Sequence, residues 1–193
     1  MMNKAIFLDK DGTLIVDVPY NVNPTQIELY PDAGPALQRM QLAGYQLVVI
    51  SNQSGIAQGY FTESALPAVW ERIADLFAPF GVVFSGFYYC PHDPLGTVSH
   101  YVMTCDCRKP KPGMLQRAVQ ELHLNLSESW MIGDILHDVE AGNRAGCRTM
   151  LVNRGNETDW IGGPYRTPTL TVNSLQEAAD QLAQTQVKAP TPV

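Results

Sequence analysis

Short apolar runs alternate along this chain with longer stretches of helical periodicity, and this alternation restricts the possible folds more than any other feature. We expect strands at Ala5–Leu8, Gln46–Ile50, Gly86–Tyr89, Trp130–Ile132, Arg148–Val152 and Leu170–Val172. We expect helices at Ala33–Ala43, with Asp32 as the N-cap, at Glu63–Ala78, with Thr62 as the N-cap, at Met114–Leu122 and at Val139–Ala145. We expect a last helix that begins with a capping box of Ser174 and Glu177. Strands joined by helices of this length form right-handed βαβ units. The pattern therefore predicts a three-layer α/β/α, Rossmann-like fold around a parallel sheet.

Length and composition are those of one globular domain. The chain has 193 residues, of which 45% are hydrophobic, and a chain of this length forms a core without disulfides or metals. We expect residues 1–186 to form this single domain. We expect 187–193, which contain two prolines, to be a disordered tail.

Charge and hydropathy argue against several kinds of partner. The chain carries 19 Asp+Glu against 13 Lys+Arg, a net charge of −6, and its longest basic cluster is Arg108–Lys111, which argues against a nucleic-acid surface. Met1–Leu8 lacks the apolar core of a signal peptide, and no later stretch approaches the roughly 20 apolar residues that a bilayer requires. We therefore expect a cytoplasmic protein that binds neither nucleic acid nor membrane. Without a long amphipathic or edge-strand interface signal, we expect a monomer.

Polar side chains gather where the predicted strands end. Asp9 and Asp11 follow the first strand, Ser51 follows the second, and Asp134 follows the fourth. The cation of Lys109 lies near the end of the long irregular stretch after the third strand. An Asp-rich turn alone is more often an ordinary turn, and a lone Ser or Lys at a strand end means little. Ligands of open parallel sheets, however, bind at the carboxyl ends of the strands, and carboxylates with Mg²⁺, a hydroxyl and a lysine are what phosphoryl transfer requires.

Three of the four cysteines lie in the irregular stretch Cys90–Gly113, which is too long for a compact domain without a function or a staple. Cys90 and His92 form one ligand pair, Cys105 and Cys107 another, and together they suit tetrahedral Zn²⁺. Because all four positions are filled, we expect a structural zinc; a catalytic zinc with an open position is the alternative. We expect Cys147 to be a packing residue and assign no role to His100, His123 or His137.

The strand-end residues carry a family resemblance. Asp9-Lys10-Asp11-Gly12-Thr13, Ser51, Lys109 and Gly133-Asp134 with Asp138 resemble the four motifs of haloacid-dehalogenase-like (HAD) phosphohydrolases, and they span nearly the whole chain. The resemblance implies that Asp9 attacks phosphorus to give an aspartyl-phosphate. It implies that Asp11 protonates the leaving group and then activates water. Mg²⁺ would be held by Asp9, Asp134 and the backbone carbonyl of Asp11.

The resemblance also suggests which residues support the metal and bind the substrate. Asp138 would support the water shell of the metal or orient Lys109. Phosphate or substrate contacts are expected from Lys10, Ser51, Asn52, Gln53, Arg108 and Lys109. Arg108 is the candidate for the substrate's distal oxygens or second phosphate, and a surface ion pair with Asp106 is the alternative.

The segment Cys90–Cys107, which holds the predicted zinc ligands and is called the Cys/His segment, narrows the resemblance together with the Arg108-Lys109-Pro110 that follows it. They resemble the histidinol-phosphatase-like branch, which contains phosphatases of D-glycero-D-manno-heptose 1,7-bisphosphate and of histidinol phosphate. The run Asn52–Ala57 with Gly59, and the segment Tyr88–His92, resemble the heptose branch. The implied reaction removes the 7-phosphate on the way to ADP-heptose for the lipopolysaccharide core. Gln58 and Ile135 depart from that branch, where Arg and Lys are usual, so histidinol phosphate stays open as the alternative substrate.

Asp11 and the short connections narrow the reaction and the architecture. A carboxylate at Asp11 points to a phosphatase, since dehalogenases need no general acid for a phosphate-ester leaving group and HAD ATPases carry Thr there. A zinc-bearing module that accepts phosphate without turnover is the alternative from another functional class. Ile15–Tyr30 and the loop after Ser51 are too short for a cap domain, so we expect a capless HAD-like domain with a zinc-stapled loop.

Overall fold

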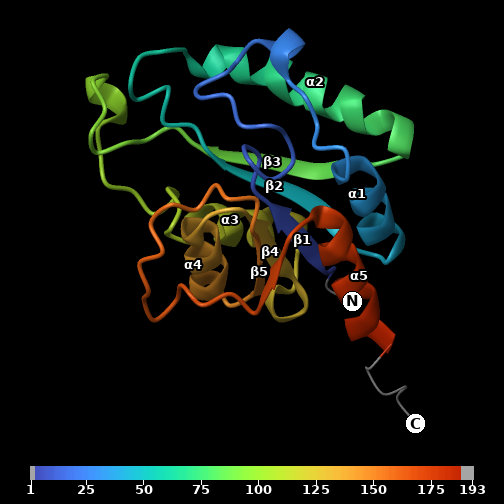
Figure 1. The fold of residues 1–193 in the computed structure, drawn as a ribbon. Helices are drawn as coiled ribbons and strands as arrows, with labels where there is room; N and C mark the ends of the chain where they lie inside the picture. Colours follow the sequence, from blue (N-terminus) through green and yellow to red (C-terminus); the bar gives the residue numbers. More distant parts are fainter. Residues whose placement is uncertain (1–2, 188–193) are drawn as a thin grey trace.

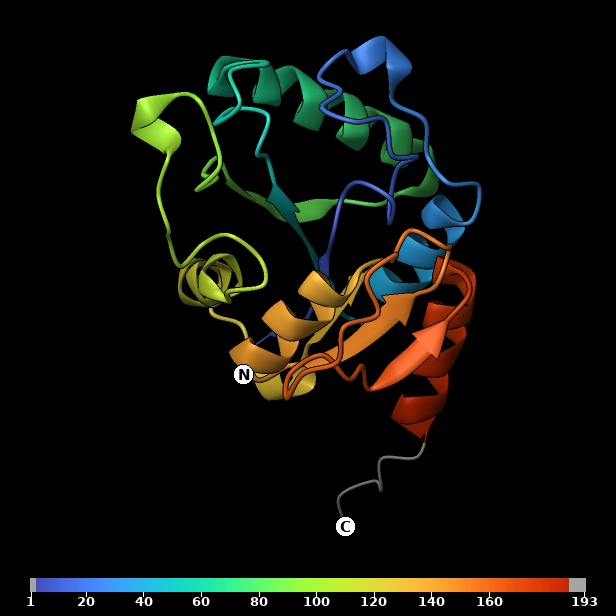
Figure 2. The ribbon, with the colours of Figure 1, turned by 60° about the vertical axis from the view of Figure 1, so that its left-hand side comes forward.

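The computed structural model describes residues 3–187, in which a six-stranded sheet lies between two layers of helices (Figures 1 and 2). The strands are β1 (Ala5–Leu8), β2 (Gln46–Asn52), β3 (Phe84–Cys90), β4 (Trp130–Gly133), β5 (Arg148–Val152) and β6 (Leu170–Val172). The helices are α1 (Ala33–Leu42), α2 (Leu66–Phe77), α3 (Gly113–Leu122), α4 (Leu136–Ala145) and α5 (Leu175–Val187). The order is β3-β2-β1-β4-β5-β6, and every neighbouring pair is parallel. The predicted α/β/α fold is confirmed.

The central strand β1 shows why the strands are continuous apolar runs. Its side chains alternate between the two faces of the sheet, and all four are fully buried. Ile6 and Leu8 belong to the core formed with α1, α2 and α5. Ala5 and Phe7 belong to the core on the other face, which α3 and α4 cover. Figure 1 shows α1 and α2 on one side of the sheet and α3 and α4 on the other.

Several predicted boundaries differ from the observed ones. The second predicted helix starts as a 3₁₀ turn, Glu63–Ala65, before α2 begins at Leu66, and the expected N-cap Thr62 makes no capping hydrogen bond. Helix α4 begins at Leu136 rather than Val139 because the Asp138 carboxylate accepts the backbone N–H of Ile135 at 3.3 Å and closes the first turn.

Two caps were also expected at Asp32 and Ser174. Asp32 precedes α1 but makes no side-chain bond to it; its carboxylate instead accepts the N–H of Leu175 at 2.7 Å and pairs with Arg154. Ser174 does accept the N–H of Glu177 at 3.1 Å, while Glu177 takes the N–H of Asn173 rather than that of Ser174. Half of the predicted capping box is therefore present.

The connections near the carboxyl edge of the sheet are irregular and contain little regular secondary structure. The segment from β1 to α1 holds one 3₁₀ turn, Pro24–Gln26, and the segment from β3 to α3 holds another, Ser99–Tyr101. The latter packs over the loop after β2, because Thr97 and Val98 both donate their N–H to the carbonyl of Ala57. The predicted disordered tail, 187–193, falls outside the described residues except for Val187, for which the prediction is wrong because Val187 is the last residue of α5. None of the helices in residues 3–187 has the length and hydropathy of a membrane span.

Candidate active site

The strand-end residues meet at one edge of the sheet. β2, β1 and β4 are parallel neighbours, so Ser51 at the end of β2, Asp9 after β1 and Asp134 after β4 face the same edge. The backbone N–H of Asp9 continues the ladder by donating to Ile132 at 3.0 Å. All three functional side chains are buried, so their charges and hydrogen bonds act in a medium that screens them weakly.

Lys109 is the positive centre of this edge. It comes from the segment between β3 and α3, yet its Nζ contacts the carboxylate of Asp9, lies 2.6 Å from that of Asp138 and donates to the carbonyl of Ile50 at 3.0 Å. Burial alone lowers the pKa of Lys109, but the charges of Asp138 and Asp9 outweigh burial and raise it. The lysine is therefore a fixed cation that can neutralise phosphoryl oxygens.

Two amides after β2 fix the neighbours of this cation. The Asn52 side chain donates to the carbonyl of Lys109 at 3.1 Å and accepts its N–H at 3.0 Å. Asn52, expected to contact substrate, thus holds the Lys109 backbone. Gln53 donates to the Ser51 hydroxyl at 2.8 Å. Because that bond uses an acceptor site of the hydroxyl, its hydrogen remains a donor.

Three carboxylates form a group that suits a hard cation. Asp9, Asp134 and Asp138 offer oxygens within 4.8 Å of one another. Burial, followed by the charges of Asp9 and Asp138, raises the pKa of Asp134 to about 8. Burial raises the pKa of Asp138 to about 6 against the opposing charge of Lys109. A divalent cation would offset this repulsion, and an all-oxygen ligand set is the type that Mg²⁺ prefers.

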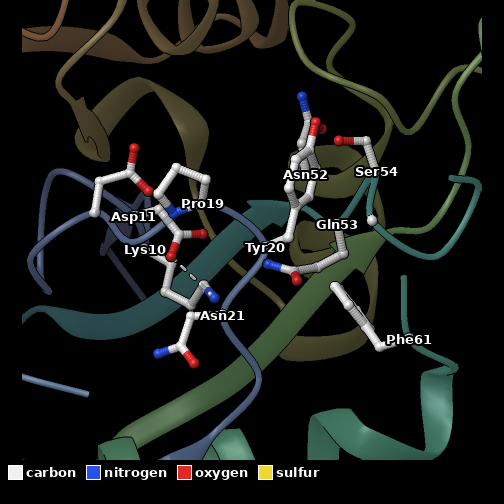
Figure 3. Close-up of a pocket in the computed structure, with 11 residues that line it drawn as sticks. Lys10, Asp11, Pro19, Tyr20, Asn21, Asn52, Gln53, Ser54 and Phe61 are labelled. Atoms are coloured by element: carbon white, nitrogen blue, oxygen red, sulfur yellow. Dashed lines mark ion pairs between the residues drawn. The ribbon is translucent and has the colours of Figure 1, made fainter. Parts of the chain in front are cut away.

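Asp11 lies in a different environment from Asp9. It lines an open cavity of about 280 Å³, together with Lys10, Asp17, residues 19–21 and 52–55, and Phe61 (Figure 3). The Nζ of Lys10 is 3.1 Å from Asp11 Oδ1 and 5.8 Å from the ring centre of Trp70. Lys10, expected among the substrate contacts, is thus turned to Asp11. Burial raises the pKa of Asp11 in spite of Lys10, and Asp9 adds to the rise, which favours a proton on this carboxyl.

The four predicted zinc ligands converge. The three sulfur atoms of Cys90, Cys105 and Cys107 lie 2.9–3.5 Å apart, and Nδ1 of His92 is 3.3 Å from Cys107 Sγ and 3.7 Å from Cys90 Sγ. Tetrahedral zinc with bonds of about 2.3 Å to sulfur places its ligand atoms roughly 3.5–3.8 Å apart. The pairs at 3.5 and 3.7 Å match this spacing, whereas the three pairs that include Cys107 are shorter, so its sulfur would have to move outward to hold the ion. Three thiols and one imidazole are the donor set of a structural zinc site. All four cysteines of the chain, which lie within the described region, are free thiols.

Arg108 leaves the Cys/His segment towards Asp93, not Asp106. Its guanidinium contacts the Asp93 carboxylate and the carbonyl of His92, each at 3.2 Å. Asp106 pairs instead with Lys111 at 3.3 Å. The alternative partner predicted for Arg108 is therefore wrong, because the chain turns between Asp106 and Arg108.

Two residues missed in the sequence hold the carboxylate of Asp134. The Thr13 hydroxyl donates to its Oδ1 at 3.0 Å, and the Asn156 amide donates to its Oδ2 at 2.8 Å. Thr13 lies in the run that contains Asp9 and Asp11. Asn156 follows β5, a strand end at the same edge of the sheet, and that position was the available signal.

Comparison with known proteins assigns this site to a family. The HAD-hydrolase-like family model matches residues 106–178. The D-glycero-β-D-manno-heptose-1,7-bisphosphate 7-phosphatase of Haemophilus ducreyi is 41% identical over 176 residues, which cover 91% of this chain and 96% of that protein. The chain belongs to this HAD-like phosphatase family. Its relative of the same name from Escherichia coli K12 is 40% identical, covering 81% of this chain and 87% of that protein.

Solved structures of HAD-like phosphatases share the fold. The D,D-heptose 1,7-bisphosphate phosphatase from B. bronchiseptica, complexed with magnesium and phosphate, has a TM-score of 0.81 at 32% identity and covers 94% of this chain and 99% of its own. A putative HAD-like phosphatase from Mesorhizobium loti has a TM-score of 0.84 at 35% identity, covering 100% of this chain and 90% of its own. As a HAD-like phosphatase, the chain is a phosphoric monoester hydrolase.

Proposed function

We propose that this HAD-like phosphatase removes the 7-phosphate from D-glycero-β-D-manno-heptose 1,7-bisphosphate in a Mg²⁺-dependent reaction. The observation that carries the proposal is the separation of two carboxyls from one turn: Asp9 lies against Lys109 in the carboxylate group, and Asp11 lines the open cavity. The relatives that are 40–41% identical bear this activity in their names. We place the reaction in the cytoplasm, where thiols stay reduced, and expect the enzyme to act as a monomer.

The two carboxyls divide the chemistry. An Asp9 oxygen attacks phosphorus, the bond from phosphorus to the sugar oxygen breaks, and Asp11 gives its proton to that oxygen. The product on the enzyme is an aspartyl-phosphate. Asp11, now a carboxylate, takes a proton from water as the water attacks the phosphorus. Phosphate then leaves and restores the Asp9 carboxylate.

The remaining residues bind charge. The Ser51 hydroxyl and Lys109 Nζ would hold the phosphoryl oxygens. Asp9, Asp134 and the backbone carbonyl of Asp11 would hold Mg²⁺, which when bound supplies positive charge to the transferring group. The direct contact of Asp138 with Lys109 supports the role of orienting the lysine.

The Cys/His segment serves recognition rather than chemistry. Cys90, His92, Cys105 and Cys107 would hold a structural zinc with no open position. The residues that directly follow Cys107 are Arg108 and Lys109. We therefore propose that zinc fixes the backbone from which Arg108 reaches the second phosphate and Lys109 reaches the first.

The test combines a variant with two substrates. Asp9→Asn should reduce phosphate release to background because the amide cannot act as the nucleophile, while circular dichroism stays unchanged. Asp180→Asn, which alters an exposed carboxylate on α5 paired with Arg39, is the matched control and should keep full activity. Wild-type kcat/KM should be at least about 100-fold higher on the heptose bisphosphate than on histidinol phosphate.

Each outcome has a definite meaning. Turnover retained by Asp9→Asn would refute the nucleophile. Equal or reversed preference between the two substrates would refute the heptose assignment while leaving the phosphatase intact. Phosphate retained on the wild-type protein without turnover, across a panel of esters with Mg²⁺, would favour the phospho-acceptor alternative.

A further inference from the structure

The segment directly after β5 contacts the two loops that carry the predicted magnesium ligands. Asn156 donates to Asp134 Oδ2 at 2.8 Å and lies 3.4 Å from the carbonyl oxygen of Gly12, in the loop after β1. The adjacent Glu157 accepts the backbone N–H of Leu136 at 2.6 Å, at the start of α4. The segment therefore contacts the turn between β4 and α4 at both its carboxylate and its backbone.

These contacts limit how the Asp134 carboxylate can move. Its Oδ1 accepts the Thr13 hydroxyl while its Oδ2 accepts the Asn156 amide. A carboxylate bonded at both oxygens cannot rotate about its Cβ–Cγ bond without losing a hydrogen bond. The fit is close, because a Cβ built at Gly12 would lie 2.1 Å from Asp134 Oδ2 and 2.7 Å from Asn156 Nδ2.

We propose that Asn156 is a positioning residue that orients the Asp134 carboxylate for the divalent cation. The inference rests on the magnesium site of the proposed function. Asn156 acts through Asp134 and contacts no reacting atom. Partners that orient metal ligands in this way are typically worth 10–100-fold in metal affinity, so this range is expected for the loss of the Asn156 amide.

The competing explanation is that Asn156 only anchors the long connection between β5 and β6. The chain offers a matched control, because Asn143 anchors the same connection from α4. Its amide donates to the carbonyls of Tyr165 at 2.8 Å and Thr167 at 2.9 Å, and its oxygen accepts the Thr149 hydroxyl. These contacts lie away from Asp134, so the two asparagines separate anchoring from metal positioning.

The experiment titrates Mg²⁺ into the purified full-length protein by isothermal calorimetry, after dialysis to remove magnesium. Asn156→Ala should raise the Kd for Mg²⁺ by about 10–100-fold, whereas Asn143→Ala should leave it within about twofold. Asn156 is exposed on its turn, so the variant should fold, and circular dichroism checks this. At saturating Mg²⁺, kcat of Asn156→Ala should approach that of the wild type.

Other results would overturn the inference. An unchanged Kd in Asn156→Ala refutes it, and so does an equal loss of affinity in Asn143→Ala, which would indicate a purely structural anchor. Failure of the wild type to bind Mg²⁺ would refute the proposed metal site itself, and the inference with it. Wild-type binding without an Asn156 effect leaves the proposed function standing.

Discussion

At the scale of single residues, the site depends on different surroundings for identical side chains. Asp9 and Asp11 are two positions apart, but Asp9 contacts the buried cation of Lys109 while Asp11 faces the cavity beside Lys10. When two carboxyls lie in different environments, one can be ionised while the other holds a proton, so that one site supplies both an anion and an acid. The raised pKa of Asp11 agrees with the proton that the proposed first step requires.

The acid role of Asp11 predicts a dependence on the leaving group. Asp11→Asn should lower kcat on a sugar phosphate by about 10²–10⁴-fold, because an alkoxide leaves poorly without a proton. The loss should be smaller on p-nitrophenyl phosphate, since nitrophenolate leaves unprotonated. Asp17→Asn, which changes another carboxylate of the same cavity, should show no such difference between the two substrates. An equal loss on both in Asp11→Asn would contradict the acid role.

The raised pKa of Asp134 predicts that protein stability depends on pH and on magnesium. Its pKa is raised from 3.8 to about 8, so in magnesium-free protein the native state binds more protons than the unfolded state between these values. Its contribution to stability is therefore present below pH 3.8 and is lost as pH rises through about 8. Asp134→Asn should remove this loss, and the melting temperature of the variant should exceed that of the wild type increasingly from about pH 5 to pH 8.

Magnesium provides the check on that prediction. Added Mg²⁺ should raise the wild-type melting temperature most at the alkaline end, because the ion binds the ionised carboxylate. Asp134→Asn should lose most of this response. If the melting temperatures of the wild type and of Asp134→Asn differed by the same amount at every pH, Asp134 would not be the group responsible.

At the scale of elements, the connection that contains the Cys/His segment is not held in place by regular secondary structure. Residues 91–112 contain one 3₁₀ turn, so other contacts must hold them. One is the Cys/His group. Another is Glu63, whose carboxylate accepts the hydroxyls of Tyr89 and, at 2.6 Å, Tyr101. The Cys/His group includes Cys107, two residues before Lys109, and Glu63 holds the same connection further upstream, at Tyr101.

Removing one zinc ligand should therefore affect both stability and catalysis. Cys105→Ser should lose bound zinc, lower the free energy of unfolding by about 3 kcal/mol or more, and reduce kcat because Lys109 is less well held. Cys147→Ser is the control, since Cys147 is a buried thiol that is not one of the four ligands and donates to the carbonyl of Gly142. Zinc content by mass spectrometry and thermal melting measure both effects. A Cys105→Ser protein with unchanged melting and kinetics would rule out a structural zinc.

At the scale of the whole molecule, one ion pair joins three elements that are distant in sequence. Arg154 after β5 bonds both oxygens of Asp32 before α1, at 2.8 and 2.9 Å, and Asp32 also accepts the first N–H of α5 from Leu175. The guanidinium lies 3.9 Å from the ring centre of Tyr30. Burial favours the neutral acid, yet the Arg154 bonds prevail and lower the pKa of Asp32.

This junction predicts a stability change without a change at the active site. Asp32→Ala should cost about 2–3 kcal/mol near neutral pH, as for charge-assisted hydrogen bonds, or roughly 4–12 °C in melting temperature. Because the native pKa lies below 3.8, the contribution of Asp32 is present above 3.8 and disappears at more acid pH. Magnesium affinity should stay unchanged. Asp180→Ala, which breaks an exposed ion pair with Arg39, should cost less than about 1 kcal/mol, and an equal cost for both would contradict the proposed junction.

The sequence alone determined the parts of this protein that depend on local periodicity and on motif spacing. β1, β5 and β6 begin and end where their apolar runs do, and the parallel topology brings Asp9, Ser51 and Asp134 to one edge. Such predictions succeed because the bounds of a buried strand, and the place of a polar residue directly after it, depend on residues that are neighbours in the sequence.

The tertiary structure alone decided which side chains meet across long stretches of chain. Asp32 pairs with Arg154 instead of capping α1, Asn52 bonds the backbone of Lys109, and Asn156, which follows β5, bonds Asp134. Each of these polar groups has several possible partners of similar strength, and only the packing of the sheet and helices selects one. Local sequence patterns do not predict these partners, because the partners are close in space but far apart along the chain.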